Sequence, residues 1–188
     1  MGKSYRKGEG EDLALLMEVI HQHHAELERE KVRPALILID PELAEDGQPK
    51  APVFKSDGDS AVGRVRPASA IERLLGKYDL RIEIDGYVWE TLSEEQQRAL
   101  LDHELTHLEI KRDAEGTIKR NADGTPRFMR RAHDWHLTGF REVVARHGRH
   151  ALEAMDLREL HSNHGQLLFG FLEEAPPVEK PEKKRKTA

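Results

Sequence analysis

A short apolar stretch that carries two histidines constrains this chain more than any other feature. Residues 100–110 read LLDHELTHLEI, so His103 and His107 are four residues apart and Glu104 directly follows the first of them. In a helix, side chains four apart lie on one face, so both imidazoles can reach a single ion. Glu104, one step round the helix, can reach a water at that ion. The pattern predicts a catalytic metal site on a helix.

The residues around this motif favour a buried helix. Ser93 is a good N-cap, and Gln96 follows three residues later, as in a capping box. Leucines flank both histidines and would bury one side of the helix in a core. We therefore expect a helix over residues 94–110. A five-residue pattern also arises by chance, so an ordinary helix is the alternative interpretation.

The sequence narrows the choice of a third metal ligand. The chain contains no cysteine, so only histidine, aspartate or glutamate could hold a metal. Six residues after the second histidine, where a compact site would have its third histidine, the chain has Asp113, a weaker candidate. A glutamate on the following helix would have to be Glu142. His133 and His136, at the expected start of that helix, are chemically better ligands, and spacing alone does not separate them.

Hydrophobic periodicity predicts an α+β fold with a small mixed sheet. PALILID at residues 34–40 is a continuous apolar run that indicates an interior strand, whereas DLRIEID at 79–85 alternates like a half-buried strand. AVGRVRPAS indicates an edge strand that ends at Pro67. The other expected elements are helices over residues 12–31, 69–76 and 133–148, and a small β-meander over residues 109–129 with turns at DAEG and NADG.

A second group of histidines, HQHH at residues 21–24, lies on the first expected helix. Such a group could be a metal patch. Because no acidic residue lies at ligand spacing from it, we expect a solvated polar face instead.

Length and composition indicate one domain with polar ends. The 188 residues suffice for one core. We expect a flexible N-terminus over residues 1–11, a single domain over residues 12–173 and a disordered Pro/Lys-rich tail over residues 174–188. The net charge of −5 argues against nucleic-acid binding, except through the KKRK run of the tail, which we expect to be solvated. With no apolar run of membrane-spanning length and no cleavable signal, we expect a cytoplasmic protein that does not bind membranes.

A longer stretch, over roughly residues 62–148, resembles the phage metallopeptidase family. That family has a Tyr-Asp pair before a strand, then a tryptophan, a Leu-x-x-Glu-Gln helix start and the His-Glu-x-x-His helix. A later His-Asp pair with an aromatic residue follows. The counterparts in this chain are Tyr78-Asp79, Trp89, Leu92 with Glu95-Gln96, His103 to His107, and His133-Asp134 with Phe140.

The resemblance implies a zinc metallopeptidase with a minimal zincin-like domain. His103, His107 and His133 would hold Zn²⁺, with His133 on a backing helix, and Glu104 would be the catalytic acid and base. Zinc with an open position lowers the pKa of its water toward about 7 and polarises a carbonyl, which suits peptide hydrolysis. The expected partner is a protein or peptide substrate.

Two other functions fit the same residues. A non-catalytic, zinc-stabilised binding module would use the histidines and would not need Glu104. A DNA-associated protease would use the basic tail as a tether, and its binding to DNA would depend strongly on salt.

Overall fold

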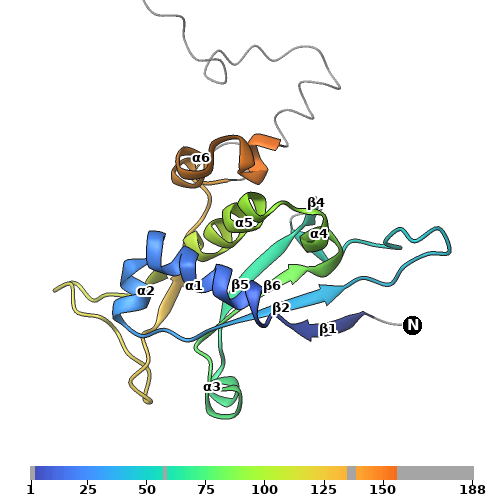
Figure 1. The fold of residues 1–188 in the computed structure, drawn as a ribbon. Helices are drawn as coiled ribbons and strands as arrows, with labels where there is room; N and C mark the ends of the chain where they lie inside the picture. The colour runs from blue at the N-terminus through green and yellow to red at the C-terminus, as the bar shows by residue number, and fades with distance from the viewer. Residues whose placement is uncertain (1–2, 57–58, 135–138, 156–188) are drawn as a thin grey trace, which may run out of the picture. The chain divides into compact units, whose positions relative to one another are not determined.

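The described part of the chain is built on a four-stranded mixed sheet (Figure 1). Its two central strands, β2 (Pro34–Asp40) and β6 (Leu80–Asp85), pair in parallel. β1 (Ser4–Lys7) pairs antiparallel with β2, and β5 (Gly63–Pro67) pairs antiparallel with β6. The order is therefore β1-β2-β6-β5, which places β5 at one edge and β1 at the other.

The computed structural model describes residues 3–56, 59–134 and 139–155. The mixed sheet, the interior strand at residues 34–40 and the edge strand that ends at Pro67 confirm the predictions. The tail and His136 lie outside the described residues.

Two helices cover one face of the sheet and form the core with it. α1 (Glu11–His23) and α5 (Glu94–Thr106) bury their apolar faces against alternate residues of the central strands, such as Leu36 and Ile82, which have no exposed surface. Burying one such side chain stabilises the fold by about 1.5–3 kcal/mol. The apolar spacing of these segments thus places α5, which carries the histidine motif, directly against the sheet.

The remaining elements lie around this layer. Among the described helices, none is long and apolar enough to cross a membrane. The elements around the sheet and its two helices are α2 (Ala25–Arg29), β3 (Phe54–Ser56), β4 (Asp59–Ala61), α3 (Ala70–Gly76), α4 (Gly86–Thr91), β7 (Leu108–Ile110), β8 (Phe128–Arg130), α6 (Arg141–His147) and the 3-10 turn η1 (Gly148–His150).

The insert between β7 and β8 is a hairpin with two tight turns. β7 and β8 pair antiparallel at its base, and isolated bridges join Arg112 to Ile118 and Arg120 to Pro126. The turns fall at the predicted DAEG and NADG sequences, where Gly116 and Gly124 have φ angles of 84° and 82°. Glycine suits these positions because a side chain is strained at positive φ.

The N-terminal segment differs from the flexible N-terminus expected for residues 1–11. Ser4–Lys7 forms β1, whose residues pair with Ile37 to Asp40 of β2. Its side chains are mostly exposed and polar, so the sequence SYRK shows no apolar alternation. Main-chain pairing with the edge of β2 accounts for this strand, and such pairing leaves no hydrophobic pattern in a sequence.

The first helix is divided at His24, in place of the single helix expected over residues 12–31. His24 has φ −126° and ψ 49°, which ends α1, and α2 starts at the next residue. The His24 Nε2 atom lies 2.8 Å from Oδ1 of Asp102 on α5. The expectation of a solvated face is therefore wrong for His24, because its acidic partner is distant in the sequence.

Asp102 joins three segments at the back of α5. It is fully buried, and its carboxylate accepts hydrogen bonds from Arg146 on α6 at 2.7 and 2.8 Å and from His147 Nε2 at 2.9 Å, besides its contact with His24. Burial alone would raise the pKa of Asp102, but the bonds from His147, His24 and Arg146 hold that pKa well below its usual range. The buried carboxylate thus stays charged and ties α6 to α5.

We predict that Asp102→Ala lowers the free energy of unfolding by roughly 3–5 kcal/mol, because it leaves the Arg146 guanidinium without its buried partner. Urea unfolding measures the change. The matched control is Glu94→Ala, which removes an exposed ion pair with Arg98 on the same helix and should cost less than about 1 kcal/mol. Equal losses in the two variants would contradict the role given to Asp102.

Candidate metal centre

Three histidines meet at the end of α5. His103 lies in the last turn of the helix, and His107 is its C-cap residue with helical φ and ψ of −65° and −12°. His133 follows β8 by three residues. One nitrogen of each ring lies within 4.8 Å of the others, and the Nε2 atoms of His103 and His133 are 3.3 Å apart. These three imidazoles could hold one metal ion.

The hairpin brings His133 to the helix. Leu108 of β7 pairs with Arg130 of β8, and the main-chain N–H of Arg131 donates to the carbonyl of His107 at 2.7 Å. α5 therefore ends at Thr106, earlier than the expected residue 110, because the chain enters β7 directly after His107. The pairing of the two strands sets the position of His133.

The prediction that His133 starts a helix is wrong. His133 and Asp134 have no regular secondary structure, and α6 begins only at Arg141. The Asp134 carboxylate accepts a hydrogen bond from the main-chain N–H of Arg141 at 3.0 Å, so this aspartate stabilises the start of α6 from a distance. The apolar spacing after His133 reflects the burial of Phe140, which precedes the helix.

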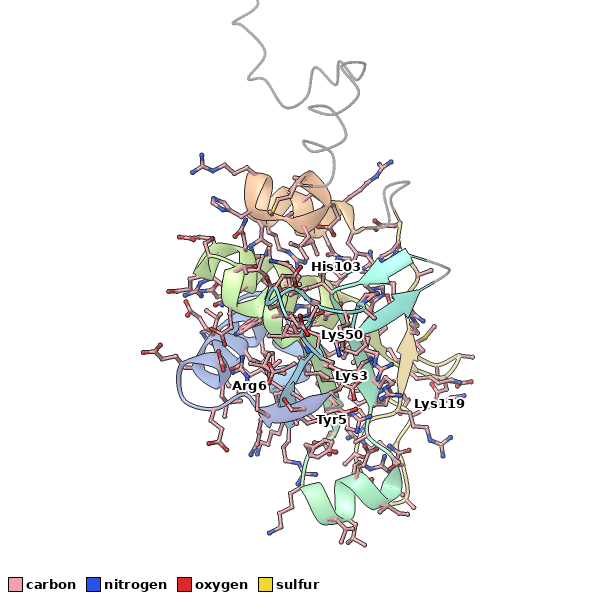
Figure 2. The ribbon with its side chains drawn as sticks, turned by 90° about the vertical axis from the view of Figure 1, so that its right-hand side faces the viewer. Lys3, Tyr5, Arg6, Lys50, His103 and Lys119 are labelled. Carbon is pink, nitrogen blue, oxygen red and sulfur yellow. The ribbon has the colours of Figure 1, made fainter. Side chains whose placement is uncertain are left out.

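Hydrogen bonds at Nδ1 orient the two helix histidines. His103 Nδ1 lies 2.7 Å from Oε1 of the buried Glu153, and His107 Nδ1 lies 3.0 Å from the carbonyl oxygen of Arg131. A carbonyl oxygen only accepts, so the His107 Nδ1 carries the proton and its Nε2 has a free lone pair. Metal-binding histidines in proteins usually make this kind of second bond. Figure 2 labels His103 on α5, near the segment that carries α6.

The donor set fits zinc. Two nitrogens that each lie about 2.0–2.1 Å from a tetrahedral zinc are about 3.3–3.4 Å apart. The separation of 3.3 Å between the Nε2 atoms of His103 and His133 matches the edge of such a tetrahedron. Three imidazole ligands would leave a fourth position open, and His133 is itself exposed to solvent.

A buried phenylalanine packs against all three imidazoles. The ring of Phe140 has no exposed surface, and its centroid lies 5.3 Å from that of His103, 4.8 Å from that of His107 and 5.1 Å from that of His133. The guanidinium of Arg131 lies 5.1 Å from the same ring. Phe140 therefore restricts the rotation of the histidine rings and keeps water from one side of the site.

Burial and charge tune the imidazoles differently. Burial lowers the pKa of His107 to about 4 and also lowers that of His133. Burial opposes the charged form of His103 as well, but the hydrogen bond with Glu153 and the charge of Glu104 raise its pKa overall. His107 and His133 are therefore neutral near pH 7, as metal ligands must be.

Glu104 lies beside the histidines, and its carboxylate interacts electrostatically with His103 and Arg130. Only 4% of the residue is exposed, and its side chain makes no hydrogen bond or ion pair with any described residue. Burial raises the pKa of its carboxyl to about 7. A Cβ atom at Gly63 of β5 would come within 2.8 Å of its Oε1, so this glycine is what lets the edge strand approach the carboxylate.

Besides Gly63, sequence reasoning missed Glu153 and Gly139. Glu153, which orients His103, lies fifty residues away along the chain. Gly139 allows it to approach, since a Cβ there would lie 2.1 Å from the Glu153 Cγ. No local pattern reveals such a contact. Glu142 and Asp113, weighed as ligands, lie elsewhere: Glu142 pairs with Arg131 and Arg146, and Asp113 stabilises a hairpin turn.

A second group of possible ligands contains His23, Asp102 and His147, again within 4.8 Å of one another. Its carboxylate is already occupied, because Arg146 donates to both oxygens of Asp102. A guanidinium this close would repel a metal cation. The group is therefore an ion-pair network, and the three-histidine group is the better metal site.

The comparisons place the chain in a family. The family model described as "Putative phage metallopeptidase" matches residues 10–163, so the chain belongs to that family. The matched region contains the three histidines, Glu104, Glu153 and every strand of the sheet except β1. No curated protein and no solved structure matches the chain. The family description implies a metal and a peptidase, which agrees with the histidine group.

We predict that the wild type retains a single zinc per chain after dialysis against a weak chelator. His133→Ala should lose it, whereas His147→Ala, at the second histidine group, should keep it. Metal content by mass spectrometry measures this, and circular dichroism checks the fold of each variant. Two zincs in the wild type, with one lost in the His147 variant, would contradict our assignment of the second group.

His136 provides a further comparison, because it lies three residues from His133 and the sequence did not separate the two. We predict that His136→Ala keeps its zinc under the same dialysis, since the Nε2 atoms of His103 and His133 already lie at ligand spacing. Zinc kept by the His133 variant and lost by the His136 variant would show that His136 is the third ligand.

Proposed function

We propose that this chain is a zinc-dependent peptidase with a zincin-like site, in which His103, His107 and His133 hold the metal and Glu104 is the catalytic acid and base. The observation that supports this function most strongly is that the three histidine rings meet beside Glu104, a nearly buried residue whose carboxylate makes no hydrogen bond with the described residues. Zinc, when bound, would lower the pKa of a water and polarise the carbonyl of the scissile peptide bond.

Glu104 would move the protons of the reaction. Its carboxylate accepts a proton from the attacking water and then donates it to the nitrogen of the leaving amine. A general base must be free to receive this proton, and Glu104 makes no competing hydrogen bond with the described residues. Its position on α5, one residue after His103, keeps it next to the metal site.

Strand β5 would position the substrate. Val62 O accepts from Asp85 N, and Ala68 N donates to Asp79 O, so even-numbered residues of this segment pair with β6. The main-chain groups of Gly63 and Val65 therefore point to the free edge of the sheet. An extended peptide can add to this edge as a further strand, and Gly63 would then hold it next to Glu104.

A zinc-stabilised binding module is the alternative with the same metal. Such a module has no use for Glu104, whose carboxylate lies beside the histidines without a hydrogen-bond partner among the described residues. The environment of Glu104 therefore favours catalysis. The basic tail lies outside the described residues, and no described feature supports a tether to DNA.

We predict that Glu104→Gln retains zinc and the fold but loses nearly all peptide hydrolysis, because the amide cannot accept the proton. A comparison of new N-termini in a digested proteome, by mass spectrometry, first identifies substrates of the wild type. Turnover on one of these substrates is then measured at equal zinc content. Activity of the variant within a few-fold of the wild type would reject the role of Glu104.

We also predict that Gly63→Ala lowers kcat by about tenfold or more while zinc content and melting temperature stay near those of the wild type. The added Cβ would press on Oε1 of Glu104, which is the flexible end of a side chain, so the carboxylate moves and the fold does not. Val65→Ala, on the same strand, is the matched control and should change kcat little. Full activity of the Gly63 variant would mean that Glu104 tolerates displacement.

A further inference from the structure

A cavity lies at the end of β5 that is farther from the histidines. Its volume is about 280 Å³, and Pro67 and Ala68, where β5 ends, form one side of it. Lys111, Arg127 and Phe128, at the base of the β7–β8 hairpin, form another. Gly63 at one end of β5 touches Glu104 and Pro67 at the other end lines the cavity, so this strand connects the two sites.

The cavity has an excess of positive charge. The carboxylate of Asp79 on its wall is neutralised by Arg33, which donates to it at 2.7 and 2.9 Å. Arg73 on the wall pairs with Asp123 at 2.6 Å. Lys111 and Arg127 have no ion-pair partner among the described residues. The two cations without partners suit an anionic group in the cavity.

The register of β5 relates this cavity to the proposed reaction. Gly63, Val65 and Pro67 share one face of the strand, which is the face covered by α5. Pro67 has no N–H, so pairing with an added peptide strand would end there. A peptide residue opposite Pro67 would therefore point to the cavity side, about four residues and roughly 13 Å from the residue opposite Gly63.

We propose that this cavity is a specificity subsite that binds an acidic side chain, aspartate or glutamate, of an extended peptide substrate about four residues from the bond that is cut. This inference rests on the proposed peptidase function. Lys111 and Arg127 contact the carboxylate, while the main chain of the peptide pairs with Gly63 and Val65. The substrate class is thus a peptide with an acidic residue at a fixed distance from the scissile bond.

The opposite face of β5 has the same sign of charge. Arg64 and Arg66 are about half exposed and share the buried carboxylate of Glu83 with Arg81. One glutamate faces three arginines there, although Arg81 also pairs with Glu72. These arginines already have a carboxylate partner, whereas Lys111 and Arg127 have none among the described residues, so the cavity is the stronger site for an acidic side chain.

Two labelled synthetic peptides test the subsite. One alternates threonine with glutamate and the other alternates threonine with glutamine, and both are long enough to cover β5 and the cavity. Threonine favours the extended conformation. Fluorescence anisotropy measures the binding of each peptide to the zinc-loaded full chain with Glu104→Gln, which does not cut it. We expect the glutamate peptide to bind at least about tenfold more tightly.

Charge reversal at the cavity should remove this preference. Adding Lys111→Glu or Arg127→Glu to the Glu104→Gln chain should weaken binding of the glutamate peptide about tenfold and leave the glutamine peptide nearly unchanged. The matched control is Lys7→Glu, an exposed lysine on β1 at the opposite edge of the sheet, which should preserve the preference. A preference that survives both cavity substitutions, or that Lys7→Glu removes equally, would overturn the subsite.

The same assay separates this inference from its alternatives. A single-stranded oligothymidylate that binds more tightly than the glutamate peptide, and loses affinity with Lys111→Glu, would assign the cavity to phosphate and overturn the peptide subsite. Cleavage of either peptide by the wild type is measured in parallel. A binding preference that depends on Lys111, without cleavage of either peptide, supports the subsite and counts against the peptidase function alone.

Discussion

The hydrogen bond between Nδ1 of His103 and the carboxylate of Glu153 joins the two halves of the site. His103 belongs to the helix against the sheet, whereas Glu153 belongs to the segment that follows α6. Burial would favour the neutral form of Glu153, but the bond with His103 lowers its pKa and keeps it charged. Asp102, one residue before His103, holds α6 in place through Arg146. Asp102 and His103, which are adjacent on α5, thus hold the segment that contains α6 and Glu153. Glu153 in turn orients His103, a proposed metal ligand.

The helix and the sheet could be predicted from sequence because local rules determine them. The capping box at Ser93 and the apolar run of residues 34–40 lie where the structure has a helix start and an interior strand. The position of His133 could not be predicted in the same way. Hydrophobic spacing placed it on a helix, but strand pairing between β7 and β8 delivers it to the site. Long-range pairing leaves little trace in the local sequence.

The supporting residues were beyond sequence reasoning for a related reason. Glu153, Gly139 and Gly63 act through contacts with residues distant in the chain, and each is an ordinary residue in its local context. The motif itself identified the candidate ligands on α5 and the glutamate between them. The structure adds the environment of Glu104, a nearly buried residue whose carboxylate has no hydrogen-bond partner among the described residues. A carboxylate in this environment, next to the three histidines, could transfer protons during a reaction at the metal site.

X-ray absorption at the zinc edge of the zinc-loaded full chain tests the central claim most directly, because it reports the ligands themselves. Our account predicts nitrogen and oxygen ligands at about 2.0–2.1 Å, with scattering from three imidazoles in the wild type. One imidazole should be missing in any zinc that His133→Ala retains. A wild-type spectrum with fewer than three imidazoles, or one that His133→Ala leaves unchanged, would contradict the three-histidine site.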